Sequence, residues 1–244
     1  MFDDFAPTLN RHLDWEALAC AFRNNGRVQI KDFLETTSAV ALHSALKKEQ
    51  SWREVINSGE KVFELSIPNP DNFDATQRAK LDSAIFEGAK AGFQFRFQTI
   101  RIPDSAMARK KTANICARFA EFLCSVAVLN FFRNVTGQAD IAFVDAQATR
   151  YSPGHFLTAH DDDIPGKSRA AAYVFGLTPI WSPDWGGLLL FHDDDLSCSA
   201  LVPGFNVLNL FAVPQTHSVS MITPFAKEER LSVTGWLRLT EPPA

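Results

Sequence analysis

The order of apolar and polar positions divides the chain into a helix-rich first part and a strand-rich second part. Apolar residues recur at helical spacing, with few helix breakers, over residues 39–46, 77–91 and 106–134, which predicts three helices. Residues 28–34 and 92–98 instead alternate with a period of two and are expected to be strands. The proline- and asparagine-rich residues 68–72 are typical of a turn.

From about residue 141 onward, the pattern changes to short apolar runs bounded by Gly, Pro and Asp. The runs cover residues 143–151, 170–177, 187–191, 205–213, 218–222 and 231–239. Many short strands joined by turns indicate an antiparallel sandwich or jelly roll, with the helices packed on its outer face. The expected class is α+β, mainly β.

The length of 244 residues suits one domain, and neither a repeat nor a flexible linker divides it. We therefore expect a single domain over residues 1–244. A flanking region of helices and strands would occupy residues 1–140, and a jelly-roll core would occupy residues 141–240.

Charge and cysteine usage narrow the possible partners and compartments. The net charge is -4 and basic residues do not cluster, so a nucleic acid is not expected as a partner. The four cysteines form no CxxC pair and are interpreted as reduced thiols. The first residues lack the pattern of a secretory signal, and no run of about 18 apolar residues could span a membrane. We expect a cytoplasmic protein without a membrane partner.

The segment 151–163 carries the first candidate chemistry. It has the pattern of a strand, and His160 and Asp162, two residues apart, should then share one face. His217, far downstream, supplies a second imidazole. Two imidazoles and one carboxylate with open coordination positions suit non-haem Fe(II), and zinc could use a similar set. His192 and Asp194 have the same spacing, but they follow a predicted strand where a turn should lie, so they are not favoured.

Arg230 follows His217 on the next predicted strand. A planar guanidinium at the end of a pocket is suited to binding a carboxylate through two hydrogen bonds, as the far end of a dicarboxylic 2-oxo acid would require. Arg238 lies on the same face of that strand and is expected at the surface. His155 should point to the opposite face from His160 and have a structural role.

The order of these motifs resembles a known family. The motifs are Tyr151-x2-Gly154, His160-x-Asp162, Trp185-Gly-Gly-x-Leu, Asn206-x-Leu-x-Leu-Phe, His217 and Arg230-Leu-Ser-x-x-Gly-Trp. They are similar to those of the Fe(II)- and 2-oxoglutarate-dependent dioxygenases, within them the prolyl 4-hydroxylase-like branch, and especially the catalytic domain of the ribosomal-protein prolyl hydroxylases. The resemblance covers residues 140–240 well and the helical half only loosely. It implies a double-stranded β-helix, the cupin-like jelly roll, with supporting N-terminal helices.

The resemblance also implies roles for individual residues. As catalytic residues and metal ligands, it indicates His160, Asp162 and His217. For binding the co-substrate, it indicates Arg230, Tyr151 and Asn206, and for contact with the substrate, Arg169 and Trp236. Relatives often have a second pocket tyrosine on the strand after Arg169; here Tyr173 either takes that place from a shifted register or the contact is absent.

The resemblance implies an enzyme that uses Fe(II), with 2-oxoglutarate and O2 as co-substrates and ascorbate as a further cofactor. It would hydroxylate a C–H bond of a prolyl residue in a protein or peptide, with release of succinate and CO2. A free amino acid or other small molecule is an alternative substrate. A non-enzymatic metal-binding jelly roll is the contrasting class, and the sequence leaves the oligomeric state open.

Overall fold

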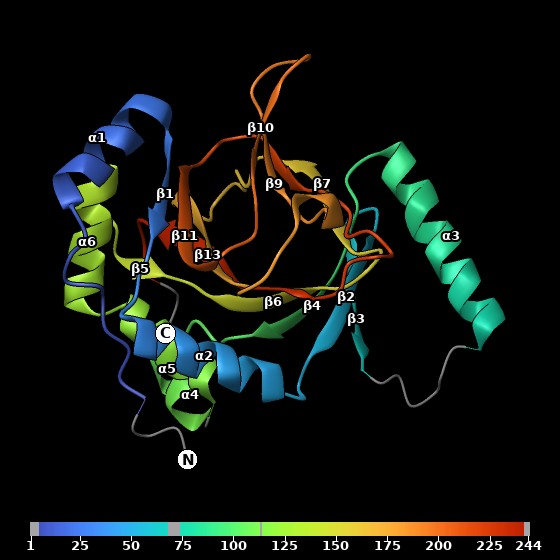
Figure 1. Ribbon diagram of the computed structural model, residues 1–244, viewed down its shortest axis with the longest axis horizontal. Helices are drawn as coiled ribbons and strands as arrows, with labels where there is room; N and C mark the ends of the chain where they lie inside the picture. Colours follow the sequence, from blue (N-terminus) through green and yellow to red (C-terminus); the bar gives the residue numbers. More distant parts are fainter. Residues whose placement is uncertain (1–4, 68–73, 113, 242–244) are drawn as a thin grey trace.

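The computed structural model describes residues 5–67, 74–112 and 114–241 (Figure 1). The turn predicted at residues 68–72 lies outside the described residues. The helices are α1 (Trp15–Asn25), α2 (Thr36–Lys48), α3 (Ala75–Ala91), α4 (Ala106–Lys111), α5 (Ile115–Leu123), α6 (Val126–Thr136) and the 3-10 turn η1 (Pro183–Trp185). The strands of the first half are β1 (Arg27–Lys31), β2 (Arg53–Ser58), β3 (Lys61–Ser66) and β4 (Phe95–Arg101). Those of the second half are β5 (Phe143–Val144), β6 (Gln147–Tyr151), β7 (Phe156–His160), β8 (Arg169–Leu177), β9 (Leu189–His192), β10 (Cys198–Leu201), β11 (Phe205–Ala212), β12 (His217–Val219) and β13 (Arg230–Arg238).

The described strands form one curled, antiparallel sheet in the order β1-β11-β8-β13-β6-β4-β7-β12-β9-β10, with β2 and β3 extending it beside β4 and β5 pairing with β13. The two ends of the sheet meet at Arg27 on β1. Its guanidinium donates hydrogen bonds of 2.9 Å to Ser199 on β10 and to Asp193, which follows β9. This closure gives the expected double-stranded β-helix. Figure 1 shows α1, α2, α5 and α6 on one side of the curled sheet and α3 on the opposite side.

The main hydrophobic core lies between the sheet and the helices α2, α5 and α6. Phe33 is fully buried and contacts Phe131 and Phe175, with ring centroids 5.8 Å and 5.5 Å away. Phe119 on α5 stacks on Phe175 at 5.5 Å. Burying a phenylalanine side chain stabilises a fold by about 2 to 3 kcal/mol. This aromatic layer therefore fixes the helices on the outer face of the sheet.

The helix predicted at residues 106–134 is divided into α4, α5 and α6, so the prediction of one long helix is wrong. The side chain of Asn114 accepts a hydrogen bond from the Ala117 amide and begins α5. Ser125 accepts one from the Val128 amide and begins α6. Asn and Ser favour this N-cap position because they satisfy amides that lack a partner within the helix. In the described part of the chain, no single helix is long and apolar enough to cross a membrane. The pair α5 and α6, bent by 56° between them, is long and apolar enough only when the two are taken together.

Helix α1 and the hairpin β2–β3 were not predicted, although the helix has recognisable end signals. Asp14 accepts a hydrogen bond of 3.0 Å from the Ala17 amide, and Gly26 ends the helix with φ of 65°. An N-cap aspartate and a left-handed glycine at the end are the usual boundaries of a helix. The hairpin turns at Gly59, which has φ of 58°.

Two predicted strands are interrupted close to the candidate site. The run 143–151 is split into β5 and β6, and Asp145, between them, bonds to β13. The run through residue 163 ends earlier, because β7 stops at His160. Each interruption changes the direction of a carboxylate: Asp145 lies between β5 and β6, and Asp162 follows the end of β7.

Candidate metal centre and its pocket

His160, Asp162 and His217 converge inside the curled sheet. Their ligand atoms all lie within 4.8 Å of one another. The Nε2 atom of His160 is 3.5 Å from Asp162 Oδ1, and Nε2 of His217 is 3.4 Å from Asp162 Oδ2. Two imidazole nitrogens and one carboxylate on one side of a site, with the other side open, form the donor set that suits Fe(II).

The three side chains reach this place by two different routes. His160 ends β7 and pairs directly with His217 on β12, so the two imidazoles are cross-strand neighbours. Asp162 lies beyond the strand, and its φ of 65° turns the carboxylate back toward the histidines. The prediction that these residues lie together holds, but the reason given for it is wrong. A left-handed backbone, which aspartate adopts more readily than most residues, brings in Asp162, and strand alternation does not.

Both imidazoles are oriented by backbone carbonyls. Nδ1 of His160 lies 3.0 Å from the Thr158 carbonyl, and Nδ1 of His217 lies 2.8 Å from the Gln215 carbonyl. Each Nδ1–H therefore donates to a carbonyl, which leaves the Nε2 lone pair directed at the site. Burial, and then the neighbouring His160, lower the pKa of His217, so its imidazole is neutral and able to bind a metal at neutral pH.

Arg230 is a buried cation beside Tyr151 in the wall of the same pocket. Its relative exposure is 4 %, and its guanidinium carbon lies 5.0 Å from the Tyr151 ring centroid. Burial raises the pKa of the Tyr151 hydroxyl to about 12, and the positive charge of Arg230 acts in the opposite direction. Within the described residues, no carboxylate pairs with Arg230. A buried charge without a counter-ion is costly, so this guanidinium is suited to an anionic ligand.

Arg169 and Trp236 form a stacked pair next to Asp162. The Arg169 guanidinium carbon is 3.5 Å from the Trp236 ring centroid, and its Nη1 donates a 3.0 Å hydrogen bond to the Asp162 carbonyl. Arg169 Nε and Trp236 Nε1 are buried donors without an acceptor in the described structure. Both residues line the pocket, and these two donor atoms are themselves buried within its wall.

Tyr173 does not supply a second free hydroxyl to the pocket. The residue is 1 % exposed, and its hydroxyl donates a 3.0 Å hydrogen bond to the Asp145 carbonyl. Its ring lines the pocket wall. Tyr173 therefore contributes shape, and the polar contact of a second tyrosine is absent here.

Asn206 is not at the pocket, so the prediction that it binds the co-substrate is wrong. Its side chain accepts a 2.9 Å hydrogen bond from the Leu34 amide and donates one of 2.7 Å to the Leu34 carbonyl. Its φ of 57° coincides with a bulge in β11. Asn206 thus attaches β11 to the segment after β1.

Arg238 is also placed differently from the prediction, because it is 8 % exposed and not at the surface. Its guanidinium lies 3.6 Å from Asp104 and 3.8 Å from Asp145. The look-alike His192 lies outside the pocket and contacts Ser218 Oγ at 2.9 Å. His155 is buried on the opposite side of the sheet, 3.9 Å from Glu54, as expected.

The pocket around the triad has a volume of about 500 Å³. Its aromatic wall, which the sequence analysis missed, consists of Phe93, Phe95 and Phe97. Neighbouring centroids lie 5.6 Å and 5.4 Å apart. Phe93 lies 5.5 Å from the His160 ring, and Phe97 stacks on Tyr151 at 5.4 Å. The alternation of residues 93–97 was the signal for this wall, because every second residue is a phenylalanine.

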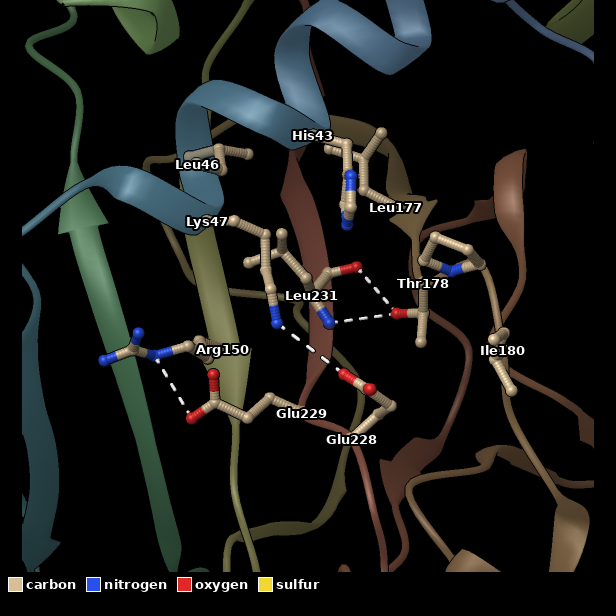
Figure 2. A pocket seen from close by; sticks show the side chains of 11 residues that line it. His43, Leu46, Lys47, Arg150, Leu177, Thr178, Ile180, Glu228, Glu229 and Leu231 are labelled. Carbon is tan, nitrogen blue, oxygen red and sulfur yellow. Dashed lines mark hydrogen bonds and ion pairs between the residues drawn. The ribbon is translucent and has the colours of Figure 1, made fainter.

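A second cavity, of about 220 Å³, is lined by Arg150 of β6 and Leu231 of β13 (Figure 2). Because side chains alternate along a strand, this cavity lies on the other face from Tyr151 and Arg230. Lys47 lies 3.6 Å from Glu228, and Arg150 lies 3.7 Å from Glu229. The charged groups of this cavity are thus paired with one another.

The fold and the site together define a class of protein: a double-stranded β-helix that holds a two-histidine, one-carboxylate centre. The comparisons with known proteins agree with this class. Residues 146–238 match the model of the 2OG-Fe(II) oxygenase superfamily. Prolyl 3-hydroxylase OGFOD1 of Mus musculus is 32% identical over 111 residues, which are 41% of this chain and 20% of that protein. The chain thus spans about a fifth of that relative's length.

Solved structures share the fold over most of both chains. A prolyl-4-hydroxylase of Pseudomonas putida has a TM-score of 0.57 at 19% identity and covers 92% of this chain and 98% of its own. A 2OG-Fe(II) oxygenase family oxidoreductase of Burkholderia pseudomallei has a TM-score of 0.60 at 13% identity, with 97% of each chain covered. A prolyl hydroxylase of Trichoplax adhaerens, in complex with a peptide fragment of hypoxia inducible factor, has a TM-score of 0.57 at 16% identity over 91% and 87% of the chains. The likeness to these structures concerns the fold, and the match to the 2OG-Fe(II) oxygenase superfamily covers residues 146–238 of this chain.

Proposed function

We propose that the protein is an Fe(II)- and 2-oxoglutarate-dependent dioxygenase that hydroxylates a prolyl residue of a protein or peptide. In the balanced reaction, a C–H bond, 2-oxoglutarate and O2 give C–OH, succinate and CO2. The observation that carries the proposal is the combination of the triad and Arg230 in one cavity. The triad supplies the donor set for Fe(II), and Arg230 is a buried cation that needs an anion.

The residues of the chain would divide the work between metal, co-substrate and substrate. His160, Asp162 and His217 hold the metal and leave its remaining positions open toward the cavity. Arg230 binds the distal carboxylate of 2-oxoglutarate, and the neighbouring Tyr151 hydroxyl donates a hydrogen bond to the same ligand. When bound, the iron and 2-oxoglutarate supply the oxidising chemistry. The aromatic wall keeps water away from the reacting groups.

Two features of the pocket support a prolyl substrate. The aromatic wall offers flat apolar surface next to His160, which suits an apolar ring better than a charged free amino acid. The unpartnered donors of Arg169 and Trp236 suit a backbone carbonyl, because a buried N–H gains most from an acceptor that replaces water. The names of the mouse, Pseudomonas and Trichoplax proteins agree with this substrate class.

The opening of the pocket supports an extended peptide. A third cavity, of about 470 Å³, adjoins the pocket of the triad, and Val62, Phe93 and Phe95 line both. Val62 and Phe93 are 51% and 49% exposed. A peptide chain could therefore pass over these side chains while one residue enters the pocket.

The test is to incubate the protein with Fe(II), 2-oxoglutarate and lysate from a strain that lacks it, and to search tryptic peptides for a gain of one oxygen on proline. We expect such peptides only in air and only with 2-oxoglutarate, together with stoichiometric succinate. The His160→Ala variant is the matched control. Hydroxylation of free amino acids alone, or binding of Fe(II) and 2-oxoglutarate without any turnover, would refute the proposal.

A further inference from the structure

Asp145 lies behind the pocket wall, in the interruption between β5 and β6, and holds Trp236 by both backbone groups. The Trp236 amide donates a 2.7 Å hydrogen bond to Asp145 Oδ1, and the Asp145 amide donates one of 3.1 Å to the Trp236 carbonyl. Gly235 permits this approach, because a Cβ there would lie 2.0 Å from the Asp145 carbonyl oxygen. The side chain of Asp145 is 13% exposed, so its carboxylate is largely shielded from water.

Trp236 is in turn connected to Asp162 of the metal centre through the side chain of Arg169. The Arg169 guanidinium is packed on the Trp236 ring and bonded to the Asp162 carbonyl, and its Nη1 is also 3.8 Å from Asp162 Oδ1. The negative groups that act on Arg169 are Asp162, which has the larger effect, and Asp145. Strand β8 runs beside β13, and Arg169 pairs there with Arg238.

A metal ion changes the balance of charge around Arg169. Once Asp162 binds a divalent cation, its charge no longer compensates the guanidinium, which then lies beside two further positive charges. Asp145 is the other carboxylate that acts on Arg169, and because its side chain is largely shielded from water its attraction is screened less than in bulk solvent. We propose that Asp145 is a positioning residue that keeps Arg169 and Trp236 in place when the metal is bound, and so strengthens metal binding. The inference rests on the proposed metal site, but not on the identity of the substrate.

Asp104 provides a matched control for the charge of Asp145. Its carboxylate also lies near Arg238, at 3.6 Å, but its side chain is 45% exposed. Replacing Asp104 by Asn removes one negative charge from beside Arg238, as the change at Asp145 does, but leaves the hydrogen bonds between Asp145 and Trp236 in place. Asp145→Asn keeps an oxygen that can accept from the Trp236 amide, so this variant should fold.

The experiment measures binding of Mn(II) alone by electron paramagnetic resonance, in wild type, Asp145→Asn, Asp104→Asn, Arg169→Met and the double variant Asp145→Asn/Arg169→Met. Loss of groups that contact metal ligands commonly weakens metal binding tenfold to a hundredfold. Asp145 acts one contact further away, so we expect about threefold to tenfold weaker binding for Asp145→Asn. Asp104→Asn should bind like wild type. The effect of Asp145→Asn should vanish in the Arg169→Met background, as coupling through Arg169 requires.

The outcomes separate this inference from the proposed function. Unchanged binding in Asp145→Asn, or an equal loss in Asp104→Asn, would overturn the role of Asp145. So would a loss that persists without Arg169, because it would reflect a general change in the fold. A wild type that binds Mn(II) but hydroxylates no prolyl peptide would refute the proposed substrate and leave the result for Asp145 intact.

Discussion

The arginines on the two faces of β6 and β13 have different electrostatic surroundings. On the outer face, Arg150 lies close to Glu229, and Arg96 bonds to Glu54 at 2.6 Å. On the inner face, Arg230 has a tyrosine and no carboxylate beside it among the described residues. Neighbouring residues of one strand thus have different electrostatic surroundings. Charges paired within the protein serve the fold, whereas a buried charge left unpaired marks the place where a ligand completes the structure.

The largest expected effect is loss of the metal donors on the inner face. His160→Ala or Asp162→Ala should lower iron-dependent turnover of 2-oxoglutarate more than about a hundredfold, because a bound metal contributes several kcal/mol to such reactions. Succinate formation measures the effect. His192→Ala removes the look-alike histidine outside the pocket and should retain full activity; a comparable loss there would contradict the assignment of the triad.

Removing the unpaired cation should have the next largest effect. Arg230→Met should raise the KM for 2-oxoglutarate about tenfold to a hundredfold, since hydrogen bonds to a charged group contribute about 1.5 to 3 kcal/mol. The matched control is Arg150→Met, on the other face of β6, which should leave this KM unchanged. Similar shifts in both variants would remove the functional difference between the two faces.

The two tyrosines of the pocket offer a finer test. Tyr151→Phe should raise the KM for 2-oxoglutarate by about threefold to tenfold, as loss of one hydrogen bond would. Tyr173→Phe removes a hydroxyl that already bonds to the Asp145 carbonyl. It should lower stability by about 1 kcal/mol and leave the KM unchanged. Steady-state kinetics and denaturant unfolding of both variants check this contrast, which an equal rise in KM would contradict.

The smallest effect concerns the paired charges of the outer face and appears only in stability. Burial, and then the charge of Arg96, lower the pKa of His155 from 6.5 to about 4. Between these values the unfolded chain binds more protons than the folded one, so the free energy of unfolding should decrease as the pH falls from about 6.5 to about 4. We expect wild type to lose on the order of 2 kcal/mol more than His155→Gln between pH 7 and pH 4.5.

Urea unfolding at both pH values measures this difference. His12→Gln, at an exposed histidine, is the control and should behave like wild type. An equal loss in wild type and His155→Gln would show that His155 takes up its proton as readily in the folded protein as in the unfolded chain.

The sequence pattern predicted the jelly roll with its outer helices, and the resemblance indicated the site residues. The prediction of secondary structure from the sequence pattern was wrong where a local feature interrupts the regular spacing of apolar residues. Asn114 and Ser125 begin new helices within an apolar stripe that looks continuous. Asp145 leaves the strand period at a point where its neighbours still alternate. In both cases a polar side chain forms a hydrogen bond with the backbone, and the spacing of apolar residues alone does not reveal such a bond.

Asn206 and Arg238 show a second kind of failure. Both were judged from their position in a motif or near the end of a strand, but their partners come from distant segments, Leu34 for Asn206 and Asp104 for Arg238. Nothing in the local sequence specifies those partners. Their burial is a property of the closed sheet.

The sequence by itself determined which chemical groups are available: two histidines and an arginine on or beside predicted strands, and an aspartate two residues after the first histidine. Tertiary structure alone decided how they meet. The left-handed turn at Asp162, the cross-strand pairing of His160 with His217, and the burial of Arg230 away from every described carboxylate depend on closure of the sheet. Closure brings together residues that are far apart in the chain, and the resulting burial gives each charge its energetic consequence.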